Sequence, residues 1–183
     1  MKKYLFLILF ALFFLNCKTV QAEEIDNQQV LLNEIGKAPI HLIEKFCEDG
    51  WQISLTDENL SQKYFNGVYE HVLAVTDSTN KAIFVENNKE SIERSTLHEL
   101  GHFVEYVEQR PDQSELFFDI YTQERNLFVS QEGNTTYARL SPVEYFAEAF
   151  QEIILHPYEV YETTPQTFAF VGYYVVKYQQ ENQ

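Results

Sequence analysis

A His-Glu-Leu-Gly-His motif at residues 98–102 most constrains this chain, because it lies in the middle of the longest helical pattern of the sequence. In an α-helix, residues four apart share a face, so His98 and His102 can point at one metal ion. Glu99 is then placed beside that ion, where it can act as a base on a metal-bound water. The motif is typical of zinc-dependent hydrolases, above all peptidases. Both histidines lie off the apolar stripe of the same helix, which consists of Leu97, Leu100, Val104 and Val107.

Two histidines do not complete a catalytic zinc site, which needs at least one more protein ligand and one position left for water. One family of such enzymes places a glycine and a third histidine after the motif, but this chain has Glu105 and Glu108 there. Glu105 faces the same way as His98, but a rise of about 1.5 Å per residue puts it roughly 10 Å further along the axis. The remaining ligand is therefore expected from another helix.

Glu144 and Glu148 offer such a ligand, because they lie four apart on a helix that Ser141 and Pro142 are expected to open. If this helix docks antiparallel to the motif helix, Glu144 can bind the metal. Glu148 is then placed to accept a hydrogen bond from a ligating histidine. The alternative is that both belong, with Glu152, to an ordinary solvated acidic face.

Strand signals come early in the chain and helix signals late, which predicts an α+β domain. Residues 51–55 alternate between apolar and polar side chains, and two short apolar runs at 72–75 and 82–85 flank a turn. A small sheet is expected from these three segments. Later helices are expected to open at Pro111, with Leu116 on its buried side, and at Pro142 and Pro165. Gly101 costs about 1 kcal/mol inside a helix, so we expect a close neighbour there.

Residues 1–22 have the charged start and the short apolar run of a secretory signal peptide, with a cleavage site after Ala22. We therefore expect a secreted protein with a single domain at residues 23–183. Cys17 allows a second outcome, a lipid anchor at the cell surface, although Asn16 stands where a lipoprotein signal has a small residue. A retained membrane anchor is a third outcome, but the apolar run is short for a stable membrane span.

The acidic balance of the chain argues against nucleic acid as a partner, because phosphate binding needs clustered lysines and arginines. Removal of the signal peptide takes three lysines and no acid from a net charge of −15, so the mature chain carries about −18. Cys47 is then its one cysteine, so no internal disulfide is expected. We expect a monomer whose partner is a protein or peptide substrate.

The residues around the motif resemble one family of metallopeptidases. After the motif at 98–102 come Tyr137, then Glu-Tyr-Phe-Ala-Glu-Ala-Phe at 144–150 and Pro-Gln-Thr-Phe-Ala-Phe at 165–170. This pattern resembles the catalytic domain of anthrax lethal factor and the small secreted Pro-Pro endopeptidases of the same family. The match runs from about Ser91 to the C-terminus. It implies a zincin (gluzincin-like) fold, in which a small mixed sheet and an active-site helix precede a helical C-terminal half.

The resemblance also implies roles for single residues. In the family, the two motif histidines and the first glutamate of the later helix bind zinc, and these correspond to His98, His102 and Glu144. The motif glutamate, Glu99, is the general base. A tyrosine seven residues before the zinc-binding glutamate stabilises the oxyanion, and Tyr137 stands at that position. The chain departs from the Pro-Pro endopeptidases at residues 66–81, which lack their tryptophan and have one glycine.

Three functions are compatible with these residues. The first is a secreted zinc-dependent endopeptidase of narrow specificity, with proline-rich sites among the candidate substrates and Glu99 activating zinc-bound water. Its substrate would lie extended along an edge strand, for which residues 82–85 are the expected segment. The second is a catalytically inactive relative that binds another protein. The third is a toxin-like effector that cleaves a host protein.

Overall fold

A computed structural model describes residues 22–180. The expected signal peptide and Cys17 lie outside this range, except for Ala22, which begins the first described helix. Across the described range, each helix is too short or too polar to span a bilayer. Described elements α2 to β3 form the N-terminal half of the fold: α2 (Ala22–Ile35), α3 (Ile40–Glu48), β1 (Gln52–Thr56), α4 (Leu60–Phe65), β2 (Ala74–Asp77) and β3 (Ala82–Glu86).

The three strands form one mixed sheet in the order β1-β3-β2. β1 pairs with β3 in parallel, and β2 pairs with β3 in an antiparallel register. The expected small mixed sheet is therefore confirmed. The expectation that residues 82–85 form an edge strand is wrong, because β3 has a hydrogen-bonded neighbour on both sides. Within the described residues, β1 and β2 are the two edge strands of this sheet.

The C-terminal half is helical, as expected. Pro111 opens a single 3-10 turn rather than the next helix, because Ser114 caps that helix by accepting from the backbone N–H of Phe117. Leu116 is 62% exposed, so its expected burial is wrong. The elements are α5 (Lys89–Val107), η1 (Pro111–Gln113), α6 (Glu115–Glu124), α7 (Thr135–Ala138), α8 (Pro142–Leu155), α9 (Pro157–Thr163) and α10 (Pro165–Gln179).

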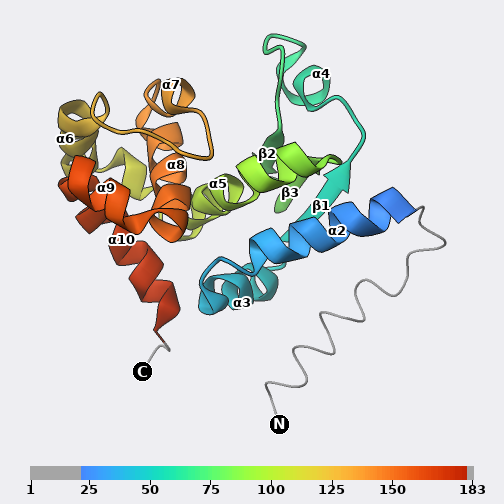
Figure 1. Cartoon of the computed structure of the whole chain (residues 1–183), viewed down its shortest axis with the longest axis horizontal. Coiled ribbons are helices and arrows are strands. Elements are labelled where there is room, and N and C mark those ends of the chain that lie inside the picture. The colour runs from blue at the N-terminus through green and yellow to red at the C-terminus, as the bar shows by residue number, and fades with distance from the viewer. Residues whose placement is uncertain (1–21, 181–183) are drawn as a thin grey trace.

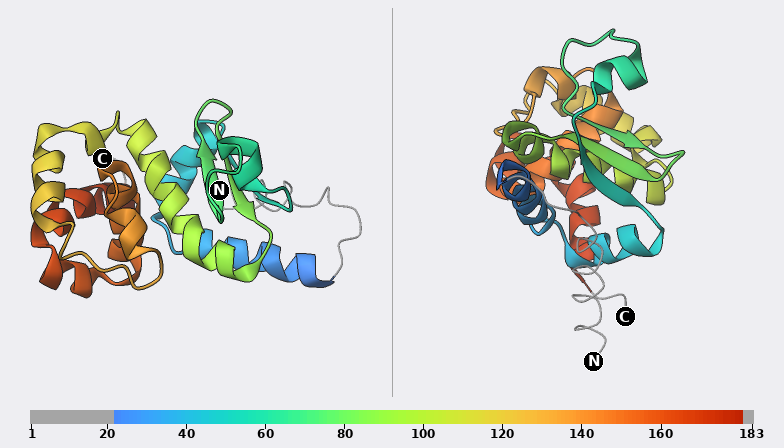
Figure 2. Two further views of the ribbon diagram at one scale, coloured as in Figure 1. Left: turned by 90° about the horizontal axis from the view of Figure 1, so that it is seen from above. Right: turned by 90° about the vertical axis from the view of Figure 1, so that its right-hand side faces the viewer.

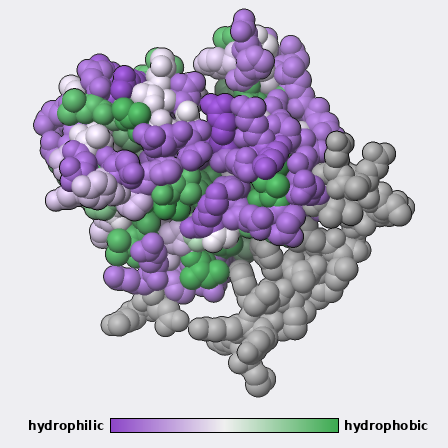
Figure 3. All heavy atoms as spheres, viewed as in Figure 1, coloured by the Kyte–Doolittle hydropathy of each residue, from purple (hydrophilic) through white to green (hydrophobic). Residues whose placement is uncertain are grey.

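Helix α5 lies between the N-terminal half and the helices that follow it. In Figure 1 it runs from the sheet towards α8, and Figure 2 shows the sheet with α2 and α3 on one side of it and α6 to α10 on the other. Asn88 begins α5 by accepting from the backbone N–H of Ser91. Leu97, Leu100 and Val104 of its stripe are buried in the core, as expected. The face of the molecule drawn in Figure 3 is mostly hydrophilic, with scattered apolar patches.

Gly101 marks a close approach of α5 and α8. A Cβ atom added there would lie 2.7 Å from the Cα atom and 3.0 Å from the carbonyl oxygen of Ala147. These are backbone atoms of α8, which cannot move without moving the helix. The close neighbour expected at Gly101 is therefore confirmed.

We expect Gly101→Ala to lower the free energy of unfolding by about 1–3 kcal/mol, because the gain in helix propensity is smaller than the cost of separating the helices. Urea denaturation measures this change. Gly172→Ala is the matched control in α10, because no described atom outside its chain neighbours and its own helix backbone lies within 4 Å of the added Cβ. That control should be neutral or stabilising by up to about 1 kcal/mol. Equal effects of the two substitutions would contradict the close approach.

Candidate metal centre

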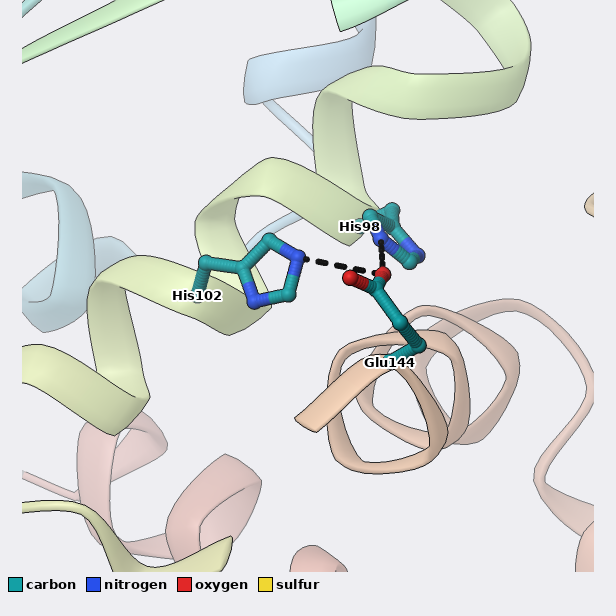
Figure 4. A group of neighbouring side chains, drawn as sticks. All are labelled: His98, His102 and Glu144. Carbon is teal, nitrogen blue, oxygen red and sulfur yellow. Dashed lines mark hydrogen bonds and ion pairs between the residues drawn. The ribbon is translucent and has the colours of Figure 1, made fainter. Parts of the chain in front are cut away.

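Side chains from α5 and α8 converge on one point. Figure 4 shows His98 and His102 of α5 directed at Glu144 of α8. Nε2 of His98 lies 3.2 Å from Oε2 of Glu144, and Nε2 of His102 lies 3.5 Å from the same oxygen. One ligand atom from each residue lies within 4.8 Å of the other two. The structure thus brings together the three residues that the sequence singled out as metal ligands.

Each imidazole is oriented by a second carboxylate at its other nitrogen. Nδ1 of His98 lies 2.8 Å from Oε2 of Glu148, and Nδ1 of His102 lies 2.7 Å from Oε2 of Glu105. A carboxylate accepts from Nδ1–H, which leaves both Nε2 atoms free to face the shared point. Glu148 makes the contact expected of it. Sequence reasoning considered Glu105 only as a ligand, although its spacing of three from His102 also suits this contact.

Buried carboxylates give the site a negative potential. Burial opposes charge on both imidazoles, but hydrogen bonds to Glu144 and Glu148 hold the pKa of His98 well above its usual value. Hydrogen bonds to Glu105 and Glu144 likewise overcome burial and raise the pKa of His102 to about 9. Burial would raise the pKa of Glu144, but its contacts with the two histidines lower it. Such a site stabilises positive charge, which suits a divalent cation.

The donor set fits a resident metal ion. Two imidazole nitrogens and one carboxylate oxygen, each imidazole held by a carboxylate, are the protein ligands of many catalytic zinc sites. Three protein ligands leave one position of a tetrahedral site for water or substrate. The geometry therefore supports a catalytic rather than a purely structural metal.

Glu99 is held at this site by the sheet. Its side chain is buried, and Oε2 accepts from Oγ1 of Thr76 at 2.5 Å. The Thr76 hydroxyl also lies 3.3 Å from the backbone oxygen of Glu99. Thr76 belongs to β2, so one of the two edge strands contacts the motif directly. Sequence reasoning missed Thr76, because a threonine within a short strand gives no sign of its partner.

Tyr137 lies at the rim of the site on α7. The centre of its ring is 6.5 Å from that of His98, and the residue is 41% exposed. Burial, and then the charge of Glu144, raise the pKa of the tyrosine hydroxyl, so it stays protonated at neutral pH. Asn134 begins α7 by accepting from the backbone N–H of Tyr137. The hydroxyl can therefore act as a hydrogen-bond donor beside the metal ligands.

The alternative of a solvated acidic face on α8 is wrong. Glu148 is 3% exposed and Glu152 is fully buried. Glu148 contacts His98, as described above, and Glu152 accepts hydrogen bonds from residues 130–132. The face is covered by α5 and by the chain that leads into α7.

Comparisons with known proteins agree with this geometry. The model of the family described as anthrax toxin lethal factor, N- and C-terminal domain, matches residues 8–173. No curated protein matches significantly. The Pro-Pro endopeptidase PPEP-2 from Paenibacillus alvei has a similar solved structure, with a TM-score of 0.62 and 17% identity, covering 86% of this chain and 94% of that one. At this identity the likeness shows the fold, which confirms the expected zincin architecture. The chain therefore belongs to the anthrax toxin lethal factor family, as a metallopeptidase domain with a candidate metal-binding group at His98, His102 and Glu144.

Proposed function

We propose that the protein is a secreted zinc-dependent endopeptidase of narrow specificity. One observation carries the proposal: the Nε2 atoms of His98 and His102 converge on the Glu144 carboxylate while their Nδ1 atoms are bound by other carboxylates. A purely structural acidic cluster has no need of imidazoles oriented in this way. Secretion is supported by the signal-peptide pattern of residues 1–22.

Zinc would be held by the two Nε2 atoms and Glu144, and it would supply a Lewis acid that polarises a carbonyl and makes a water molecule acidic. Glu99 takes the proton of the attacking water and returns it to the leaving amine. Thr76 occupies one oxygen of Glu99, which fixes the carboxylate and leaves the other oxygen for this proton transfer. Tyr137 donates a hydrogen bond to the carbonyl oxygen as negative charge develops there.

The substrate is proposed to lie extended along the free edge of β2. Peptides bind such edges by adding a strand, so main-chain hydrogen bonds hold them whatever their sequence. Thr76 ties this strand to Glu99, which supports a scissile bond placed close to the base. Proline-rich peptides are the first substrates to test, because PPEP-2 is a Pro-Pro endopeptidase with a similar fold.

We expect Glu99→Gln to lower kcat by about 10²–10⁴-fold, because the amide cannot accept the proton of water. A peptide library digested with the purified protein measures this loss, and metal analysis should find one zinc per chain in both proteins. A chelator should abolish cleavage by the wild-type protein. Glu93→Gln, at an exposed position of the same helix, is the control and should keep full activity. A folded, zinc-loaded wild-type protein that cleaves no peptide would instead indicate an inactive relative.

Tyr137→Phe removes a hydroxyl and keeps the ring. We expect kcat to fall by about 10²–10³-fold with zinc content unchanged, because the lost donor acts on the charge that develops in the transition state. Tyr158→Phe, at a 68% exposed position of α9, is the matched control. Steady-state kinetics on one cleaved peptide measure kcat for both variants. A wild-type kcat in Tyr137→Phe would show that this residue has no part in the mechanism.

Thr76→Val keeps the shape of the side chain and removes its hydrogen bond to Glu99. Loss of a hydrogen bond to a charged group costs about 1.5–3 kcal/mol, so kcat should fall by roughly 10–100-fold. Thr76→Ser keeps the hydroxyl and should retain most activity. Equal losses in both variants would show that packing, rather than the hydrogen bond, sets the contribution of Thr76.

A further inference from the structure

Glu152 makes contacts that the proposed chemistry does not use. Its Oε1 atom accepts from Oγ of Ser130 at 2.7 Å and from the backbone N–H groups of Gln131 and Glu132 at 2.8 and 3.1 Å. Its other oxygen, Oε2, has no hydrogen-bond partner within residues 22–180. One buried oxygen thus gathers three donors from the segment 130–133, which we call the 130–133 turn.

This carboxyl group is costly where it lies. Glu152 is fully buried, and no lysine, arginine or histidine of the described chain forms an ion pair with it. Burial raises the pKa of the carboxyl group. A buried acid without a cationic partner is destabilising, and an apolar side chain at this position of α8 would give a more stable fold. The three hydrogen bonds to the 130–133 turn are the favourable contacts that only an acceptor at this position can make.

The turn is also held on the side of the metal centre. The Ser130 oxygen also lies within hydrogen-bonding distance of Oε1 of Glu148, whose other oxygen accepts from His98, so the single hydroxyl proton is shared between the carboxyl groups of Glu148 and Glu152. The same hydroxyl accepts from the backbone N–H of Gly133 at 2.7 Å. A Cβ atom added to Gly133 would lie 1.6 Å from Oε1 of Glu148, so a larger residue there would displace this carboxyl group. The turn is therefore fixed between two carboxyl groups of α8.

Hydrogen bonds continue from the turn into α7. The backbone N–H of Ser130 donates to Oγ1 of Thr135 at 2.9 Å, which ties the start of the turn to the first residue of the helix. Asn134, next to the turn, accepts from the backbone N–H of Tyr137 at 3.0 Å. Movement of the turn would therefore move α7 and the tyrosine that it carries.

We propose that Glu152 is a positioning residue, which holds the 130–133 turn and thereby keeps Tyr137 beside the metal centre. The effect on catalysis rests on the proposed peptidase function, whereas the hydrogen bonds to the turn do not. Glu152 acts through other groups and does not touch the substrate. Its effect should therefore depend on the Tyr137 hydroxyl.

Two substitutions separate the acceptor from the volume of the side chain. Glu152→Leu fills the space without an acceptor, and kcat should fall by about 10–100-fold because the tyrosine is misplaced. KM and zinc content should change by less than about threefold, since the ligands are untouched. Glu152→Gln keeps an acceptor oxygen and should stay within about threefold of the wild-type kcat. Glu162→Gln, at an exposed position of α9, is the control.

A double-mutant cycle distinguishes positioning from a general structural role. In a Tyr137→Phe background, Glu152→Leu should lower kcat by less than about threefold, because the hydroxyl that it positions is already gone. A loss as large as in the wild-type background would overturn the proposal. So would a fall in kcat of equal size in Glu152→Gln and Glu152→Leu.

Amide hydrogen exchange tests the turn without any peptidase assay. Gln131 and Glu132 are exposed residues, yet their amide protons should exchange slowly in the wild-type protein because Glu152 accepts from them. Exchange should be at least about tenfold faster in Glu152→Leu and should stay slow in Glu152→Gln. Rapid exchange of both amides in the wild-type protein would overturn the proposal even if the protein is an active peptidase. Slow exchange in a protein without activity would contradict the proposed function alone.

Discussion

The close contact between α5 and α8 is the constraint on which the site depends. Neither helix carries a metal site alone, because two histidines lie on one and the third candidate ligand on the other. Gly101 lets the backbones approach to a distance that a Cβ atom would prevent. A wider spacing would separate the Nε2 atoms from Glu144, even with every side chain in place. The glycine between the two histidines therefore permits the helix spacing that the site requires.

The close contact of α5 and α8 buries several acidic side chains, which need polar partners inside the protein. Glu105, Glu148 and Glu152 are all nearly or fully buried. Two of them are bound to imidazoles, and the third is bound to backbone and hydroxyl donors. A buried acid is tolerated only where such partners exist, so removal of one partner leaves the other unsatisfied. The acids therefore contribute less to stability than to fixing a single arrangement of the side chains they hold.

The sequence was sufficient to predict those parts of the site that lie on long helices. Periodicity of 3.6 residues gives the face of each side chain, and it placed Glu144 and Glu148 opposite the motif. Periodicity does not tell what covers a face, so it cannot predict that Glu152, named only in the alternative of a solvated acidic face, is buried. Nor does it give strand order, which depends on pairing between distant segments. For this reason the role of Thr76 and the central position of β3 emerge only from the structure.

The acids of α8 form a series with graded distance from the metal centre. Glu144, Glu148 and Glu152 follow one another at intervals of four residues, or about 6 Å of rise. The first faces the metal position, the second orients an imidazole, and the third holds the turn that leads to Tyr137. All three contacts originate from one rigid helix, α8. The positions of the candidate ligand, of the imidazole and of the turn before Tyr137 are therefore fixed relative to one another. Catalysis of the proposed kind needs this arrangement, because a displacement of about 1 Å in one group can cost as much as its removal.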